Sequence, residues 1–487
     1  PRAMGWGGQL SNEWGSFGRR MLGAGLRYRG KWGSSRSRIY HFQSDNSFSY
    51  PDITRPGSPE SVQEQAFFRQ SGILQDFYYR PAPRHLLSFK TWYDQTYREL
   101  PPLLINPRQV SDRMQDFNWR SIAQWQHQNS WGHWMVNSGW VAGDNNFRTA
   151  NDTAASQNRF RSWQNNVRWK KSWWQQRFHT EAGMVLRWDQ AESPGLGGQV
   201  RQQQHSVFAS AEWRWAPQWQ LSALLRQSWL DQQRAPLIGS LGLAWQWRAH
   251  QKLYASLARN FRFPTLNDRF WQPGGNPDLK PEDSHSLEVG YRYSPRLGDQ
   301  RVVFQANGFF NWVNNWIQWL PGENFWSPQN YRAVFNRGLE MSLEHRWQWG
   351  QMRLREGMRY HYLRAENTAF YGGQNPPKGE QLPYVPQHAL NASAALAWRH
   401  WELRYLQSFY GRYYLNASNR SYMPAFPLSH LALSKRWPLG PGWQLLSSIS
   451  VRNLMDIDYQ ILPYRPEPGR HFWLRLELRW RENPSRG

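Results

Sequence analysis

The sequence predicts an all-β protein, a transmembrane antiparallel β-barrel of about 22 strands, and three observations lead to this prediction. Short stretches along the chain alternate apolar with polar residues, no run of eighteen apolar residues occurs, and 33 tryptophans accompany a mean hydropathy of −0.84. A strand shows alternate residues to opposite faces, so a barrel in lipid needs only every second residue to be apolar. A helical membrane protein needs long apolar runs and is therefore excluded.

The first third of the chain predicts seven strands separated by turn residues. The strands are expected at about 7–14, 19–29, 36–49, 66–79, 85–97, 115–128 and 133–142. The turns are expected at 31–35, 81–83 and 129–132, and Gly143–Asn146 is a turn by composition, with Ca²⁺ ligation as the weaker interpretation.

From about residue 157 onward fifteen strands are expected, because short connections alternate with long ones. The short ones are flanked by Trp, at Trp169–Trp173, Trp215–Trp219, Trp347–Trp349, Trp398–Trp401 and Trp437–Trp443, with Trp247 and Tyr293–Arg301 in the same series. The long ones lie near 190–203, 231–237, 260–283, 314–332, 365–382, 412–423 and 454–468. Short periplasmic turns at one rim and long extracellular loops at the other are typical of outer-membrane barrels. The lumen of such a barrel is too wide for its own side chains to fill.

The last strand shows the two faces most clearly. Phe472, Leu474, Leu476, Leu478 and Trp480 alternate with Trp473, Arg475, Glu477 and Arg479. An apolar face ending in Trp suits lipid and a charged face suits a lumen, and the many indoles suit two aromatic girdles. The alternative is an aromatic-rich soluble β-protein, such as a carbohydrate binder.

Charge and composition narrow the partners and the chemistry. The net charge is +24 and the isoelectric point is near 10.4. However, the sequence contains no block of Lys and Arg and no nucleic-acid motif. Outer-membrane lipid and lipopolysaccharide are therefore expected as partners, and nucleic acid is not. The absence of Cys excludes disulfides and thiolate sites. The histidines have no ligand spacing, and no cofactor, metal site or enzymatic activity is expected. The histidines considered are His41, His127, His133, His361 and His388.

A long motif resembles a known family. Leu257–Asn267 contains Arg-Asn-Phe-Arg-Phe-Pro, Gly275–Glu282 reads Gly-Asn-Pro-Asp-Leu-Lys-Pro-Glu, and Ser286–Tyr291 continues as a strand. Together they resemble the barrel signature of TonB-dependent outer-membrane receptors, closest in style to cobalamin and siderophore receptors. Shorter pieces agree with this resemblance, at Gly15–Gly18, Asn336–Glu340, Asn453–Asp456, Tyr459 and Pro468–Arg470.

The resemblance implies an outer-membrane receptor that takes up a scarce, large nutrient with energy delivered through TonB. Residues 1–487 are then expected to form the barrel domain alone, with the plug domain and the TonB-binding segment of the family outside this chain. A plug in cis or in trans and TonB are the implied partners. The alternative is a plugless barrel that acts as a scaffold subunit or as a passive pore.

Two groups of residues are expected to serve the site. Aromatic side chains in long loops are expected to contact the ligand: Phe270, Trp271, Trp316, Trp319, Phe325, Trp326, Tyr331 and Tyr371. The alternatives for them are a second girdle and contact with a surface lipoprotein. Inward charges are implied to face the plug: Glu288, Arg292, Glu340 and Arg346. Their alternative is a solvated wall.

Overall fold

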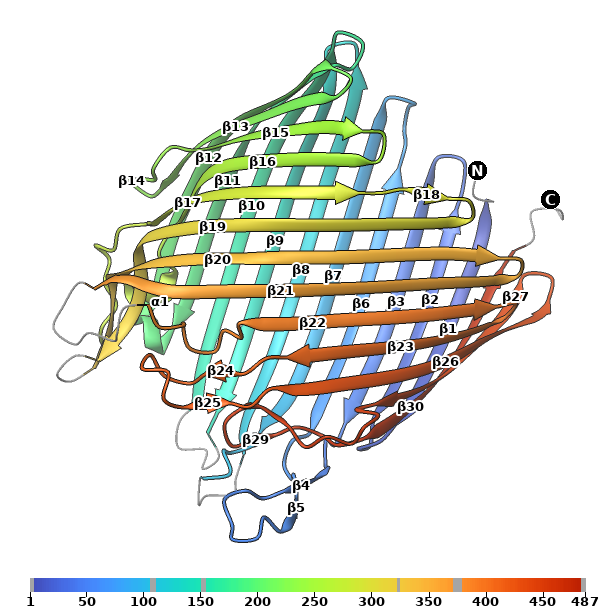
Figure 1. Cartoon of the computed structure of the whole chain (residues 1–487), viewed down its shortest axis with the longest axis vertical. Coiled ribbons are helices and arrows are strands. Elements are labelled where there is room, and N and C mark those ends of the chain that lie inside the picture. Colours follow the sequence, from blue (N-terminus) through green and yellow to red (C-terminus); the bar gives the residue numbers. More distant parts are fainter. Residues whose placement is uncertain (1–3, 106–110, 150–154, 322–324, 371–378, 483–487) are drawn as a thin grey trace.

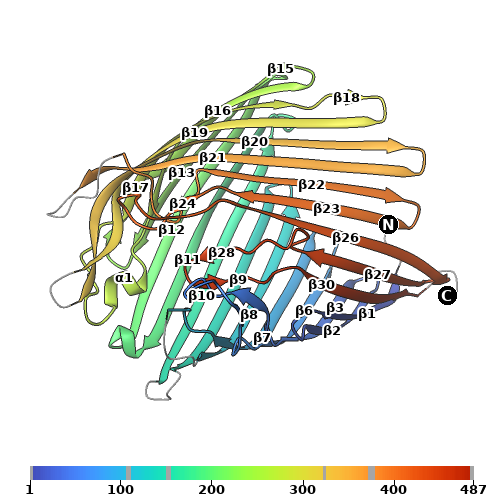
Figure 2. The same ribbon diagram turned by 60° about the horizontal axis from the view of Figure 1, so that its bottom comes forward.

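The computed structural model describes residues 4–105, 111–149, 155–321, 325–370 and 379–482. Within these residues one sheet of 24 strands closes on itself, and two of its members, β14 and β18, only prolong hairpins, so that 22 antiparallel strands form the barrel wall. Figures 1 and 2 show the wall and its lumen, with the two chain ends close together at the rim of short turns. The predicted fold class and strand number are confirmed.

The wall strands follow one another in chain order. They are β1 (Gly5–Gly15), β2 (Arg20–Arg29), β3 (Gly33–Ser44), β6 (Phe68–Tyr79), β7 (His85–Leu100), β8 (Asp112–Asn129), β9 (Gly132–Arg148), β10 (Ala155–Trp173), β11 (Phe178–Ser193), β12 (Gly198–Ala216), β13 (Trp219–Leu230), β15 (Ile238–Arg248), β16 (Gln251–Arg262), β17 (Glu282–Tyr293), β19 (Gln300–Pro321), β20 (Trp326–Trp349), β21 (Met352–Phe370), β22 (His388–Trp398), β23 (Trp401–Tyr410), β26 (Phe426–Gly440), β27 (Trp443–Arg452) and β30 (His471–Arg481).

Smaller elements lie in the connections. The strands are β4 (Ser49–Pro51), β5 (Glu60–Val62), β14 (Gln233–Arg234), β18 (Arg296–Leu297), β24 (Tyr413–Tyr414), β25 (Tyr422–Met423), β28 (Gln460–Leu462) and β29 (Arg465–Pro466), and the helices are the 3₁₀ turn η1 (Pro194–Leu196) and α1 (Leu266–Phe270). Among the described residues, no helix is both long enough and apolar enough to cross a membrane.

Several predicted connections are wrong because strand pairing continues through them. The turns expected at Trp169–Trp173 and Trp347–Trp349 lie inside β10 and β20, and the chain reverses later, at 174–177 and 350–351. Trp347 and Trp349 stack on one face of β20 with ring centroids 5.8 Å apart, so this pair marks a girdle rather than a turn.

The long-loop rim also departs from the prediction. β11 and β12 run as a paired hairpin through most of 190–203, β19 and β20 do so through most of 314–332, and β21 extends to Phe370. Gly143–Asn146, expected as a turn, belongs to β9 and pairs with both β8 and β10. Polar hydrogen bonds hold this segment in the sheet, since Asn145 donates to Asp116 and accepts from Asn158.

The two faces of the wall differ in character. On the outside, Leu225 and Val289 are 59% and 51% exposed. On the lumen side, Asp94, Asp189 and Glu477 are each only 3% exposed and pair with arginines. Apolar side chains therefore face outward into lipid and buried polar pairs face inward, the inverse of a soluble protein.

Tryptophans form a girdle near the short-turn rim. Trp215, Trp219 and Trp245 stack across neighbouring strands, with ring centroids 5.9 and 5.2 Å apart and planes nearly parallel. The ammonium group of Lys435 lies 3.4 Å from the ring of Trp437. An amphipathic ring beside a snorkelling cation suits the boundary between hydrocarbon and water.

Candidate functional site

The 263–281 loop, which joins β16 to β17, carries the long sequence motif and folds around α1. Thr265 begins the helix because its hydroxyl accepts a hydrogen bond from the backbone N–H of Asp268 at 3.1 Å, while the Asp268 carboxylate accepts one from the N–H of Thr265 at 2.9 Å. This reciprocal cap fixes the first turn of a helix too short to persist alone. Pro264 directly before it ends β16.

Two arginine–carboxylate pairs close the base of this loop. Arg262 at the end of β16 makes a bidentate contact with Glu282 at the start of β17, and Arg259 does the same with Asp283 at 2.9 and 2.7 Å. Glu282 is 7% exposed and also accepts the backbone N–H of Ile317 at 2.9 Å. These charged residues of the motif therefore have a structural role, which sequence reasoning missed because it depends on register.

The loop is held against the β19–β20 hairpin on one side. The indole N–H of Trp319 donates to Asp268 at 3.0 Å, and the hydroxyl of Ser327 donates to the carbonyl of Gly274 at 2.9 Å. Gly274 has φ +118° and lies so close to the carbonyl of Trp326 that a Cβ would overlap it at 2.3 Å. Only glycine fits this position.

The other side of the loop contacts the β11–β12 and β13–β15 connections. Gln272 donates its backbone N–H to the carbonyl of Gly195 at 2.7 Å, and Arg269 pairs with Asp231 at 3.0 Å. The ring of Trp271 rests on Gly195, where a Cβ would lie 2.6 Å from the indole. The loop thus bridges two parts of the rim and lies over one side of the opening (Figure 2).

The structure brings five of the eight predicted ligand-contact residues together. Phe270 and Trp271 lie at the end of α1, and Trp319, Phe325 and Trp326 lie on or beside the facing hairpin; Trp271, Phe325 and Trp326 are 39%, 46% and 60% exposed. Trp316 lies on β19. Tyr331 lies on β20, and Tyr371 lies outside the described residues. Ligand contact at all eight stays a prediction.

A cavity of about 500 Å³ lies beside Trp271, and sequence reasoning did not predict it. Its polar wall is a chain of hydrogen bonds across neighbouring strands. Asp116 on β8 accepts from Asn145 on β9, which accepts from Asn158 on β10, which in turn accepts from Ser193 on β11. Single Asn and Ser residues far apart in sequence carry no signal of such a ladder.

The 453–470 loop crosses the mouth from the opposite side. Asn453, 2% exposed and with φ +47°, fastens its base by donating to the carbonyl of Ile457 and accepting the N–H of the same residue. At its tip, Tyr464 accepts the N–H of Leu104 at 3.2 Å, and Arg465 donates to the carbonyl of Pro101. Figure 2 shows β28 within the opening of the barrel.

Two carboxyl groups in the 453–470 loop have shifted pKa values of opposite sign. Asp456 accepts hydrogen bonds from the backbone N–H and the guanidinium of Arg470, which lower its pKa from the usual 3.8. Burial raises the pKa of Glu467 from 4.5 and, with Glu467 adding a smaller effect, the pKa of Tyr459 to about 12. Ionised Asp456 therefore stabilises the folded loop, and ionised Glu467 opposes it.

We expect the 453–470 loop to be held most firmly at a pH between these two pKa values. The contribution of Asp456 is lost as pH falls through its lowered pKa, and that of Glu467 is lost as pH rises above 4.5 through its raised pKa. Glu467→Gln should slow hydrogen exchange of the loop amides at pH 7 and change little at pH 4. Glu60→Gln, in another loop, is the control, and equal exchange in Glu467→Gln and wild type at pH 7 would contradict the prediction.

The four predicted plug-facing residues share the lumen side of the wall. Arg292 and Arg346 line one hollow, and Glu340 contacts His361 at 3.2 Å. Glu288, on β17, has the same parity as Arg292. Contact with a plug stays a prediction. In the described chain, no three His, Asp or Glu side chains are grouped as a metal site would require.

Comparisons with known proteins agree with the barrel fold. The family model described as "TonB dependent receptor-like, beta-barrel" matches residues 5–454. The vitamin B12 transporter BtuB of Photobacterium profundum is 23% identical over 291 residues, which cover 57% of this chain and 44% of that relative. The chain thus matches less than half the length of this curated relative.

Solved structures share the barrel at low sequence identity. The FrpB iron transporter from Neisseria meningitidis (F3-3 variant) has a TM-score of 0.79 and 14% identity, covering 99% of this chain and 82% of that one. A mutant of the ferric enterobactin receptor PfeA from Pseudomonas aeruginosa has a TM-score of 0.77 and 15% identity, covering 98% and 81%. At such identity the likeness concerns the fold.

Proposed function

Since the chain belongs to the TonB-dependent receptor β-barrel family, whose members are outer-membrane proteins, we propose that it is the barrel portion of an active transporter for a scarce, large nutrient of the cobalamin or siderophore-iron class. In this proposal a plug domain, supplied in cis or in trans, closes the lumen, and TonB delivers the force that shifts it. Ligand is caught at the extracellular mouth, which is the rim of long loops.

One observation carries the proposal. The barrel wall closes around a wide lumen, and at the mouth of this lumen the loop and hairpin described above hold partly exposed aromatic side chains in place. Trp271 and Trp326 lie on either side of the bonded contact between the 263–281 loop and the β19–β20 hairpin. Large aromatic surfaces held in place lose little conformational entropy when a ligand binds. The named relatives, a vitamin B12 transporter, an iron transporter and a ferric enterobactin receptor, support the ligand class.

Growth on a limiting nutrient tests the proposal. A strain that lacks the gene is grown with either cyanocobalamin as the only source of cobalamin or a ferric chelate as the only source of iron. Growth is compared with and without the whole gene restored, and with TonB present or deleted. We expect restored growth on one source that requires TonB. Restored growth without TonB would point to a passive pore. No restoration of growth on either nutrient would point to a scaffold.

Substitutions at the mouth are expected to weaken ligand capture. In the double variant Trp271→Ala/Trp326→Ala, the affinity of cells for the transported nutrient should fall about tenfold or more, because truncation of an aromatic anchor typically costs more than about 1 kcal/mol. Trp349→Ala removes an exposed indole at the short-turn rim and serves as the matched control. Radiolabelled nutrient binding to whole cells measures both, and an unaffected double variant would exclude these residues from the site.

A further inference from the structure

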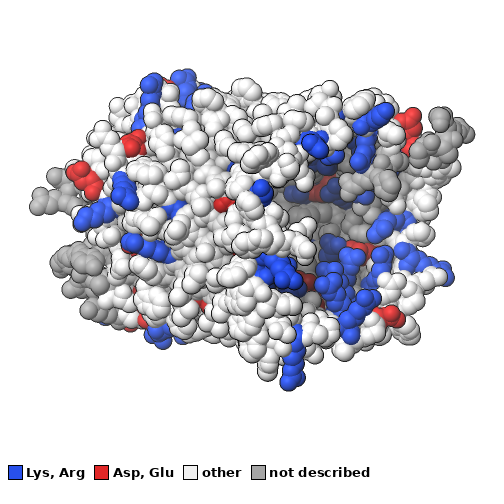
Figure 3. Space-filling model, turned by 90° about the horizontal axis from the view of Figure 1, so that it is seen from above, with Lys and Arg blue, Asp and Glu red and all other residues white. Residues whose placement is uncertain are grey.

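The lumen face of the wall from β16 to β21 carries a block of basic side chains, here called the basic wall. It consists of Lys252, Arg292, Arg301, Arg346, Arg353 and Arg355. Val289 and Leu343, exposed on the outside, fix the opposite parity of β17 and β20 as the lumen side. Figure 3 shows Lys and Arg gathered around the hollow towards the end of the molecule that carries the termini, with Asp and Glu side chains between some of them.

The register places like charges directly opposite one another. Lys252 pairs with Arg292 between β16 and β17, Arg301 pairs with Arg346 between β19 and β20, and Arg346 pairs with Arg355 between β20 and β21. Directly opposed side chains on paired strands lie within about 5.5 Å at Cβ, and like charges there repel. An unrelieved row of this kind destabilises the wall.

Some arginines elsewhere in the lumen have a carboxylate partner, as Arg187 has in Asp189 at 2.8 Å, whereas Arg226 donates a hydrogen bond to the hydroxyl of Ser206 instead. On the basic wall, Arg346 meets Glu344 at 3.6 Å. Among the described residues, no ion pair is formed by the other five members of the basic wall. Within the described part of the chain, Glu344 is thus the one carboxylate that forms an ion pair with this wall, and most of the positive charge of the wall is not neutralised.

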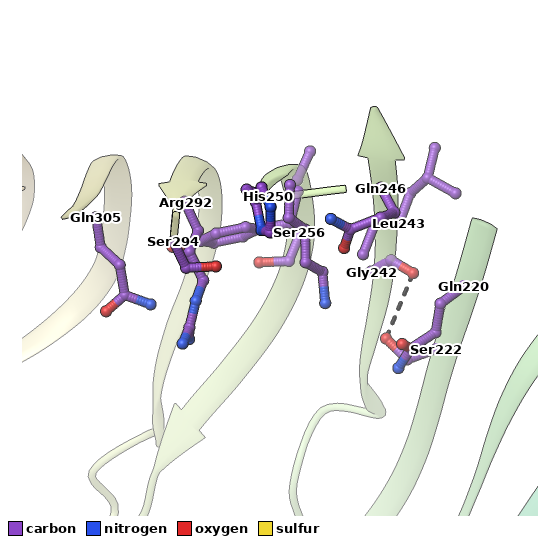
Figure 4. A pocket seen from close by; sticks show the side chains of 14 residues that line it. Gln220, Ser222, Gly242, Leu243, Gln246, His250, Ser256, Arg292, Ser294 and Gln305 are labelled. Atoms are coloured by element: carbon purple, nitrogen blue, oxygen red, sulfur yellow. Dashed lines mark hydrogen bonds between the residues drawn. The ribbon is translucent and has the colours of Figure 1, made fainter. Parts of the chain in front are cut away.

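Hollows in the wall lie between these side chains. Arg292, Arg301 and Arg346 surround a notch of about 150 Å³, which Val303, Gln305 and the acidic residue Glu344 also line. A larger hollow of about 550 Å³ continues from it past Arg292 and Gln305 and is seen from close by in Figure 4, where Gln305, Arg292 and Ser256 come from neighbouring strands. Another, of about 680 Å³, continues past Arg301 and Arg346.

We propose that the basic wall is a binding site for multiply charged anions, with the notch taking one phosphate or carboxylate group and the adjoining hollows taking others. The guanidinium fork binds such groups through paired hydrogen bonds, and a bound anion relieves the repulsion along the row. Charge of one sign on low-dielectric walls also concentrates oppositely charged solutes in the lumen. As part of the proposed uptake route, on which it rests, the site would favour an anionic cargo near the periplasmic end.

Titration calorimetry of the purified chain in detergent, with inorganic pyrophosphate as the probe at low ionic strength, tests the site. We expect binding that Arg301→Gln/Arg346→Gln weakens at least tenfold and that added salt weakens in wild type. Arg346→Lys keeps the charge but loses the fork, so an intermediate loss is expected. Arg404→Gln is the matched control, because Arg404 also faces the lumen but pairs with Glu402 at 2.6 Å, and its affinity should stay within about twofold.

Three outcomes would overturn the inference: no pyrophosphate binding by wild type, equal affinity in the double variant, or an equal loss in Arg404→Gln. Retention of the heat-modifiable band on unboiled gels shows that each variant is folded. Calorimetry on the isolated chain does not depend on uptake. Normal TonB-dependent growth with no anion binding would thus remove this inference alone, and anion binding without growth would remove the proposed function alone.

Discussion

Leu225→Arg is expected to destabilise the folded barrel by about 2–4 kcal/mol, the range found for a cation at the bilayer midplane of a β-barrel. Leu225 is 59% exposed on the outside of β13, between Trp219 near one end of the strand and Trp229 near the other. Hydrocarbon offers the guanidinium no hydrogen-bond partner, and the middle of the strand is the point farthest from the water at either rim.

The neighbouring Leu224 supplies the control for this prediction. Leu224 lines a hollow on the lumen side, so Leu224→Arg adds the same group one residue away in a hydrated setting. Unfolding by urea from phospholipid vesicles, followed by tryptophan fluorescence, gives both free energies of unfolding. Similar costs for the two variants would mean that the assignment of lipid and lumen faces is wrong.

Glu282→Ala is expected to release the 263–281 loop and to destabilise the protein by about 2–3 kcal/mol. The buried carboxylate accepts both arms of Arg262 and the N–H of Ile317, so its removal leaves the backbone donor unpaired and leaves Arg262 with only Asp268, at 3.8 Å. The value is set below that of a fully buried pair because Arg262 is half exposed.

Limited proteolysis of intact cells measures this release. Cleavage within 263–281 should accelerate in Glu282→Ala and stay unchanged in Glu288→Ala, which removes an exposed carboxylate from the same strand. Nutrient binding should fall with Glu282→Ala as well, since Phe270 and Trp271 lose their support. If Glu282→Ala is cleaved no faster than wild type, the Arg262–Glu282 pair does not hold the 263–281 loop in place, and the prediction is wrong.

The alternation of apolar and polar residues made the barrel wall predictable. The prediction failed at strand segments outside the lipid, where nothing requires one face to be apolar. Within lipid, one face of each strand must be apolar, so seven early strands and the hairpins from β10 onward follow from the pattern. Outside the lipid both faces of a strand can be polar, so the sequence pattern does not reveal that β19 and β20 continue beyond the membrane. The strand pairing in the structure reveals this, since Gln318 pairs with Gln329 and Pro321 pairs with Trp326.

The site could be predicted in part. Aromatic residues in long loops were expected at the mouth, and five of them meet there. Their anchors could not be foreseen, because Asp268 meets Trp319 and Gly274 meets Ser327 only after two hairpins dock. The crossing of Tyr464 to Leu104 joins residues 360 positions apart, a contact that local patterns do not encode.

The seam between β1 and β30 has a consequence for biogenesis. Leu10 pairs with Leu478, and the N–H of Trp6 is accepted by Glu482, 476 positions along the chain. The first strand must wait with an open edge until the last one arrives, and until then any exposed strand is a template for wrong pairing. Such a contact order makes closure slow and late. A chaperone that shields β1 during transit would therefore matter more for yield than the stability of the finished barrel.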